Sequence, residues 1–154
     1  MSRPPARPAK QRKQDTLHRL EHDEDVWVAT AGADGGVPYL VPLSFLWDGS
    51  ALLLATPANS PTGRNLRMTG RARLGVGPTR DVVMIEGTVE TLTTDQLAEG
   101  EADRFAARTG FDPRQLSTPY LYFRVRPQRV QAWREADELR GRELMADGKW
   151  LVAD

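Results

Sequence analysis

The sequence has no cysteine and only two histidines. Without cysteine it has no disulfide bond, no cysteine-ligated metal, no iron–sulfur cluster and no thiol nucleophile. His18 and His22 stand four residues apart, a metal-ligand spacing, but no further histidine or cysteine can complete a site. We therefore interpret this pair as a solvated helix face. No histidine elsewhere can act as a general base, so an enzyme with this sequence would need a cofactor to carry its chemistry.

Long apolar runs are also missing. The most apolar stretch, 37–47, contains two prolines and is far shorter than the roughly 20 residues of a membrane-spanning helix. No apolar segment follows the basic N-terminus, so we expect no secretory signal, no membrane partner and a cytoplasmic location. The sequence also lacks a nucleophile elbow, a Walker loop and a dinucleotide-binding fingerprint.

Opposite charges balance over the 154 residues, with 21 of each sign, but they are unevenly distributed. Residues 1–14 hold five basic residues and no acidic one, which leaves 16 basic against 21 acidic residues in the remainder. This segment has three prolines and almost no large apolar side chain. We therefore predict a disordered basic arm over 1–14 and one domain over 15–154. No aromatic residue in the arm could stack on bases, so we do not expect nucleic acid as a partner.

Alternating apolar residues between turn signals predict a mainly β protein with minor α content. Pro38 and Pro42 lie on the same edge of one strand, which places that strand at a sheet edge or a bulge. Six or seven strands, mostly joined by hairpins, predict a closed or partly closed antiparallel barrel. The expected strands are 25–31, 37–47, 51–56, 72–77, 81–92 and 120–133, with a last hairpin in 143–152; the expected helices are 15–22, 64–69 and one longer helix at 95–108.

The loop and short helix between 57 and 69 form the most informative segment. The hydroxyls of Ser60 and Thr62, the flexible Gly63 and the Arg64 guanidinium follow a strand and open a helix. Such an arrangement can bind a phosphate group at a helix N-terminus. The same residue types also make ordinary loops, so the residues alone leave both interpretations open.

Several short segments occur in a distinctive order along the chain: Val28–Thr30, Asp34-Gly35, Pro38, Val41–Leu43, Leu53–Thr56, Ser60, Arg64–Leu66, Ile85–Gly87, Val130–Trp133 and Leu139–Leu144. Together they resemble the pyridoxamine 5′-phosphate oxidase-like family over roughly 15–152. The resemblance implies an antiparallel split β-barrel that binds FMN, and a homodimer whose cofactor sites lie at the subunit interface. It also implies an oxidoreductase that transfers a hydride between the reduced cofactor and a small-molecule substrate.

The resemblance also implies cofactor contacts at particular positions. Those implied along the flavin ring are Val41, Pro42, Leu43, Leu54, Ala55 and Thr56. Those implied at the phosphate are Ser60, Thr62, Arg64 and Asn65. Val82 falls where the oxidases often have a flavin-contacting glutamine, and Trp133 and Arg142 match C-terminal residues that reach the flavin. No catalytic residue is assigned, and protons would come from solvent or from Tyr39, Tyr120 or Tyr122.

Two departures from the family pattern affect the function. Thr62 stands where the family usually has a lysine, which weakens phosphate binding or shifts it to Arg64, Arg67 or Arg71. Arg140 stands where the true oxidases have a substrate-binding histidine, so we do not expect pyridoxamine 5′-phosphate oxidation. The 8-hydroxy-5-deazaflavin coenzyme remains the alternative to FMN, because many relatives with a short barrel use it. A non-catalytic flavin-binding or storage protein, or a barrel without a cofactor, remains the alternative to an enzyme.

Simpler roles remain open for two of these residues. Trp133 could be a core or interface aromatic, because it ends a strand of alternating polarity. Arg142 could pair with Glu138 or Glu143 at the surface.

Overall fold

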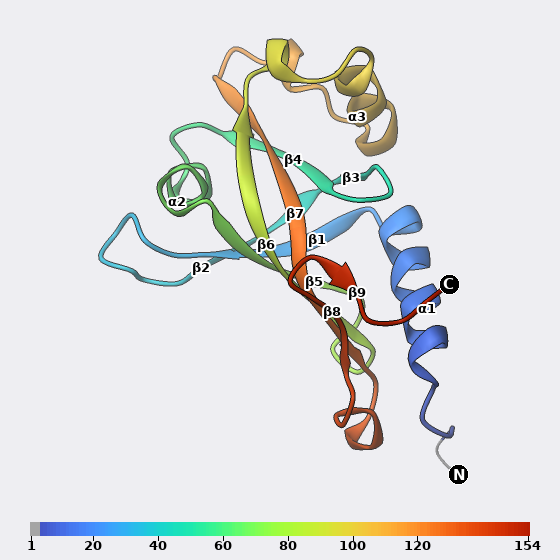
Figure 1. Cartoon of the computed structure of the whole chain (residues 1–154). Coiled ribbons are helices and arrows are strands. Elements are labelled where there is room, and N and C mark those ends of the chain that lie inside the picture. The colour runs from blue at the N-terminus through green and yellow to red at the C-terminus, as the bar shows by residue number, and fades with distance from the viewer. Residues whose placement is uncertain (1–3) are drawn as a thin grey trace.

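The alternating pattern folds into one antiparallel sheet of nine strands with three α-helices around it, in a computed structural model that describes residues 4–154 (Figure 1). In chain order the elements are α1 (Ala9–His22), β1 (Asp25–Thr30), β2 (Tyr39–Ser44), β3 (Leu46–Trp47), β4 (Leu52–Pro57), α2 (Pro61–Thr69), β5 (Arg71–Val76), β6 (Val82–Leu92), α3 (Glu101–Thr109), β7 (Tyr120–Trp133), β8 (Glu143–Ala146) and β9 (Lys149–Trp150). Single 3₁₀ turns lie at Thr94–Gln96, Pro113–Gln115 and Ala136–Glu138.

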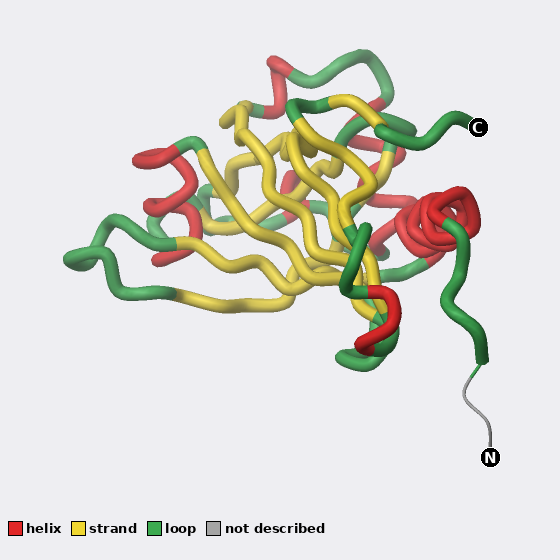
Figure 2. Tube along the Cα trace, turned by 60° about the horizontal axis from the view of Figure 1, so that its bottom comes forward, coloured by secondary structure: helices red, strands yellow, loops and turns green. Residues whose placement is uncertain are grey.

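The sheet curls because one continuous stretch of chain, residues 39–47, supplies the strands at both ends of the sheet. The strand order is β2-β1-β5-β6-β7-β4-β3, and β8 and β9 extend from β7. We expected one strand over 37–47, but it is interrupted at Phe45, which is buried. Before Phe45 the chain pairs with β1, and after it the chain pairs with β4. This change of partner links the two ends of the strand order through one stretch of chain, and the expected split β-barrel is confirmed. Figure 2 shows the strands as one curved sheet.

Two further predictions concern the edge position of β2 and the number of strands. β2 ends the strand order, and Pro42 on it lies opposite Trp27, so the prediction of an edge strand is confirmed. Nine strands are present where six or seven were expected. β8 and β9 are the two strands of the last hairpin, which was expected in 143–152, so that expectation is confirmed. β3 has two residues and is the short part of the interrupted strand after Phe45.

The main core lies inside the curl, where inward residues of six strands meet Leu20 of α1 and Leu66 of α2. A smaller cluster lies on the other side of β4 and β7, beneath α3, and contains Leu53, Phe105 and Tyr122. Residues 52–56 of β4 are therefore buried on both faces. This explains why that segment is a continuous apolar run and not an alternating one.

Tyr122 is the one aromatic residue of this smaller cluster with a polar group fully inside it. Its Oη atom has no hydrogen-bond partner among the described residues, and burial raises the pKa of this tyrosine. It therefore does not fit the role of a proton donor to a ligand. Because the hydroxyl is buried without a partner, we expect Tyr122→Phe to leave the free energy of unfolding unchanged or raise it by up to about 1 kcal/mol. Urea denaturation tests this, with Tyr120→Phe as the half-buried control. A loss of more than about 1 kcal/mol would show that the hydroxyl has a partner.

The N-terminal segment differs from the disordered arm expected over 1–14. Residues 1–3 lie outside the described residues, but α1 begins at Ala9 and includes part of that segment. Arg12 and Lys13 on α1 are buried, and Arg7 before it is largely buried. Their charged groups bond to carbonyl oxygens and carboxylates far along the chain. Low hydrophobicity therefore failed as a sign of disorder, because this segment is held by long-range polar contacts.

The longer helix expected at 95–108 is also divided. A capping box between Thr93 and Gln96 supports only a single 3₁₀ turn. Gly100 has a positive φ of 77°, and α3 starts only after it. Glu101 stabilises this second start, because its carboxylate accepts the Ala98 amide and the Arg124 guanidinium. Among the helices within residues 4–154, none is long and apolar enough to cross a membrane.

Candidate functional site

Helix α2 starts directly against the end of β4, and local hydrogen bonds fix that start. The Ser60 hydroxyl accepts the Gly63 amide at 3.0 Å and donates to the Pro57 carbonyl at 2.8 Å, so Ser60 is the N-cap. Pro61 follows at a position where a missing amide hydrogen costs nothing. A Cβ on Gly63 would lie 2.3 Å from the Pro57 carbonyl oxygen, so only glycine permits this close approach. The sequence thus sets α2 firmly on the strand end.

A hollow of about 460 Å³ lies beside α2, lined by two arginines. The Arg64 guanidinium is half-exposed and lies 3.5 Å from the exposed Asp34 carboxylate. Arg67 donates to the carbonyls of Gly63 and Ala58, which holds its side chain across the first turn. Two arginines and one aspartate line the hollow, so it has a net positive charge. Its chemistry fits an anionic group such as a phosphate.

Two of the residues expected at the phosphate are buried in this structure. The Asn65 amide donates to the Thr30 hydroxyl at 3.1 Å, and its oxygen accepts the Ala33 amide at 2.8 Å. Asn65 therefore ties the β1–β2 loop to α2. Thr62 is 2% exposed and does not extend a polar head into the hollow as a lysine would. Of the four expected phosphate residues, Arg64 is the one that lines the hollow, while Ser60 caps the helix.

The residues expected along the flavin ring occupy neighbouring strands. On β2, Val41 and Leu43 are half-buried against the core while Pro42 is exposed. On β4, Leu54, Ala55 and Thr56 are buried, so contacts from them would come from the strand end and its backbone. The Thr56 hydroxyl lies 3.4 Å from that of Ser60, which joins the strand end to the helix start.

The three remaining predicted residues form a second group. Val82 begins β6 and pairs with Trp133 at the end of β7. The Arg142 guanidinium lies over the Trp133 ring, 5.6 Å from its centroid. Arg142 does not pair with either carboxylate considered from the sequence, since Glu138 bonds to Arg7 and Glu143 to Arg129. Trp133 is half-buried and belongs to neither core cluster. The Trp133 ring, with the Arg142 guanidinium over it, therefore lies at this end of the sheet.

The two groups lie far apart in the chain's own fold. Thr56 pairs with Leu121 near the start of β7, whereas Val82 pairs with Trp133 at its end. Twelve residues of strand separate these points, a path of roughly 40 Å along β7 (Figure 1). The two groups therefore lie at opposite ends of β7.

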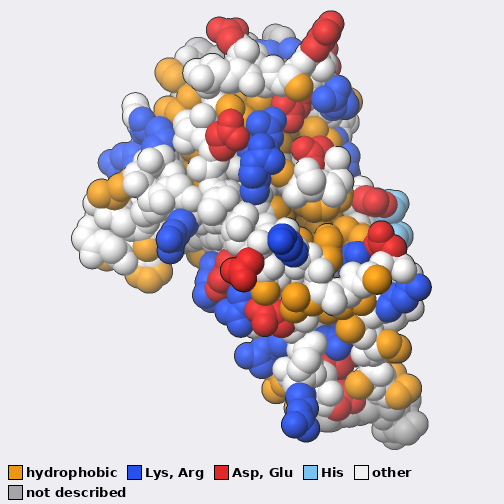
Figure 3. All heavy atoms as spheres, in the orientation of Figure 1, with side chains coloured by type: hydrophobic (Ala, Val, Ile, Leu, Met, Phe, Trp, Pro, Cys, Tyr) orange, Lys and Arg blue, Asp and Glu red, His pale blue; other side chains and the backbone are white. Residues whose placement is uncertain are grey.

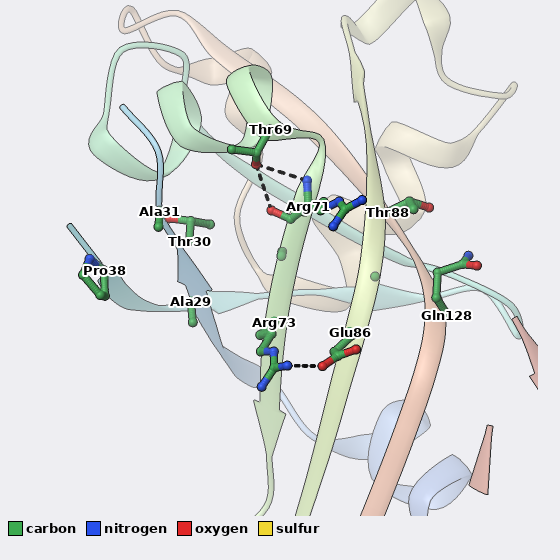
Figure 4. A pocket seen from close by; sticks show the side chains of 12 residues that line it. Ala29, Thr30, Ala31, Pro38, Thr69, Arg71, Arg73, Glu86, Thr88 and Gln128 are labelled. Carbon is green, nitrogen blue, oxygen red and sulfur yellow. Dashed lines mark hydrogen bonds and ion pairs between the residues drawn. The ribbon is translucent and has the colours of Figure 1, made fainter. Parts of the chain in front are cut away.

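A larger hollow of about 670 Å³, not expected from the sequence, lies on the outer face of β1, β5 and β6 (Figure 4). Figure 4 shows Arg73 paired with Glu86 on its floor and Arg71 extending toward Thr88. In the sequence, this hollow was indicated only by β5, where charged outward residues alternate with buried ones. Large apolar side chains are exposed on the neighbouring hairpin of β1 and β2; they are Trp27, Val37, Tyr39 and Leu40. Figure 3 shows hydrophobic side chains at the left, over the end of this hairpin.

The curled antiparallel sheet, with a capped helix and a cationic hollow at one strand end, defines a split-barrel protein. A family model described as pyridoxamine 5′-phosphate oxidase matches residues 14–134, and the chain belongs to this family.

Solved structures with the same fold are distant in sequence. An F420 reductase is 19% identical with a TM-score of 0.60, covering 73% of this chain and 93% of its own. A FAD-binding protein from Mesorhizobium loti is 20% identical with a TM-score of 0.59, covering 77% and 89%. A protein of unknown function from Agrobacterium tumefaciens is 16% identical with a TM-score of 0.70, covering 93% and 64%. Among curated proteins, none matches this sequence.

Proposed function

We propose that the protein is an oxidoreductase that binds FMN, or alternatively the 8-hydroxy-5-deazaflavin coenzyme, and acts on a small molecule. The observation that carries this proposal is the hollow of about 460 Å³ beside α2, which Arg64 and Arg67 line with positive charge. Family membership and the likeness to an F420 reductase and a FAD-binding protein support it. The bound cofactor would supply the hydride chemistry. The chain's own residues would hold its phosphate, cover its ring and exclude water.

We further infer that two copies build each site. The two groups of candidate residues lie at opposite ends of β7, so a second copy in reversed orientation would bring Trp133 and Arg142 of one protomer to α2 of the other. The exposed apolar hairpin supports a self-association surface, because Trp27 is 52% and Leu40 59% exposed. Light scattering of the purified protein should give twice the mass of one chain.

A non-catalytic flavin-binding or storage protein is the second candidate. The observation that favours it is the buried Thr62, which leaves the phosphate loop without the lysine that the family usually has. The buried, unpartnered Tyr122 hydroxyl favours it too, because it removes one of the three guesses for a proton donor. Under either candidate, Arg140 in place of the substrate-binding histidine argues against pyridoxamine 5′-phosphate oxidation.

Fluorescence titration of the purified chain with FMN and, separately, with the deazaflavin tests the cofactor. Sub-micromolar saturation by one of them would identify it. Turnover of the loaded protein with a reductant and an acceptor would then separate an enzyme from a storage protein. If neither compound binds, the proposed function is wrong.

The arginine at the hollow gives a sharper test of where the phosphate lies. We expect Arg64→Ala to weaken binding of the identified cofactor about tenfold, or about 1.4 kcal/mol, because a half-exposed charged hydrogen bond is lost. Arg104→Ala is the matched control, since this exposed arginine lies on α3 and its guanidinium, among residues 4–154, donates only to the Glu99 carbonyl. Equal affinity of wild type and Arg64→Ala would move the phosphate elsewhere.

A further inference from the structure

A single buried guanidinium joins the two ends of the loop that carries Trp133 and Arg142. One nitrogen of Arg12, Nη1, donates to the Gly141 carbonyl at 2.9 Å and to the Ala132 carbonyl at 3.3 Å. These two carbonyls belong to the residues immediately before Arg142 and Trp133. The Ala132 amide also donates to the Arg142 carbonyl at 3.0 Å, which closes the neck of the loop.

The middle of the same loop is held by Arg7. The Arg7 backbone amide and guanidinium donate to the Glu138 carboxylate at 2.7, 2.8 and 3.1 Å. Glu138 also accepts the Arg134 amide at 2.8 Å, so its carboxylate organises the loop from inside. The Glu138 side chain is 1% exposed and that of Arg7 is 8% exposed. Arg12 therefore holds the two ends of the loop together, and Arg7 holds its middle through Glu138.

We propose that Arg12 is a positioning residue of the cofactor site, which sets the placement of Trp133 and Arg142 without touching the cofactor. This inference rests on the proposed function. Its physical basis is that a planar guanidinium at 6% exposure holds two carbonyls at a fixed separation. The loop is thereby ordered before a ligand arrives, and binding does not have to supply that ordering entropy.

Lys13 provides a matched control for a merely structural role. It follows Arg12 on α1, is equally buried at 6% exposure and carries the same charge. Its ammonium group donates to the Val152 carbonyl and to Asp154, and lies over the Trp150 ring. No recorded hydrogen bond or ion pair of Lys13 involves 132–142. Loss of either cation should lower stability, but only loss of Arg12 should loosen the loop.

The experiment compares wild type, Arg12→Met, Arg12→Lys and Lys13→Met by hydrogen exchange and by titration with FMN and the deazaflavin. We expect faster amide exchange over 132–142 in Arg12→Met only, with at least a tenfold loss of cofactor affinity. Arg12→Lys should recover part of both, because an ammonium can still reach one carbonyl. In an Arg142→Ala, Trp133→Ala background, adding Arg12→Met should have almost no further effect on affinity.

Three results would overturn the inference: unchanged exchange over 132–142 in Arg12→Met, equal affinity losses in Arg12→Met and Lys13→Met, or a full additional loss in the double-alanine background. Failure of the proposed function is distinguishable from these. Wild type would then bind neither cofactor, and the exchange data alone would decide whether Arg12 orders the loop.

Discussion

Arg7→Met is expected to lower the free energy of unfolding by about 3 kcal/mol. The substitution keeps much of the side chain's volume but removes the positive charge that faces Glu138. Glu138 is then a buried carboxylate that keeps the Arg7 and Arg134 amides and the Arg134 guanidinium at 3.8 Å, but loses the Arg7 guanidinium, its closest cation. A buried carboxylate that loses its closest cation is far more destabilising than a broken surface pair. Guanidinium chloride denaturation measures the change.

The pH dependence of stability is a second test of the ion pair between Arg7 and Glu138. Hydrogen bonds from Arg7 lower the pKa of Glu138 from 4.5 to about 2. Because the folded pKa is depressed, the stabilisation is complete above about pH 4.5 and is lost as the pH falls toward 2. In wild type the loss over this window should reach about 3 kcal/mol from this group. In Arg7→Met the pKa of Glu138 should return upward, so the loss in this window should shrink.

An exposed pair serves as the control for Arg7. Arg80 is 78% exposed and bonds to Glu135, so Arg80→Met should change stability by less than about 1 kcal/mol. If Arg7→Met changed stability as little as Arg80→Met, then Glu138 would be hydrated in solution and the buried pair would not anchor the N-terminal segment.

Strands were predictable where burial leaves a clear period in the sequence. β7 alternates in burial over much of its length, and its bounds, Tyr120–Trp133, agree with the expectation. The edge position of β2 followed from Pro38 and Pro42, because a missing amide hydrogen constrains pairing wherever the strand lies. The interruption of the strand at Phe45 could not be predicted from the sequence, because a strand that changes partners keeps its own alternation of apolar and polar residues. It depends on which strands lie beside it, and a single sequence does not contain that information.

The N-terminal segment and the candidate site show that the partners of polar residues could not be predicted from the sequence. Arg7 and Arg12 look like solvated charges in sequence, because their partners, Glu138 and Gly141, lie more than 120 residues away. Asn65 was expected at a phosphate, yet its amide spans α2 and the β1–β2 loop. Composition indicates that a residue is polar, but only the fold indicates whether its partner is water, a ligand or the chain itself.

Gly63→Ala is expected to lower the free energy of unfolding by about 3 kcal/mol and to weaken cofactor binding with it. Helix propensity alone would favour alanine by about 1 kcal/mol, so the sign depends on the contact. The added Cβ would lie 2.3 Å from the Pro57 carbonyl oxygen and 3.0 Å from that of Ala58. Both atoms are backbone and cannot move aside without shifting the end of β4. The start of α2 must then move, and Arg64 moves with it.

Gly75→Ala separates this steric effect from the general effect of replacing a buried or half-buried glycine. A Cβ at Gly75 on β5 would lie 3.8 Å from the Met84 sulfur and 3.8 Å from the Trp27 Cβ, both ordinary contacts. Gly75→Ala should therefore change stability by less than about 1 kcal/mol. Urea denaturation of both variants decides the matter. If Gly63→Ala were as stable as wild type, helix propensity would outweigh the contact, and α2 would not be fixed against Pro57. The hollow lined by Arg64 and Arg67 would then lack the rigid support on which phosphate binding depends.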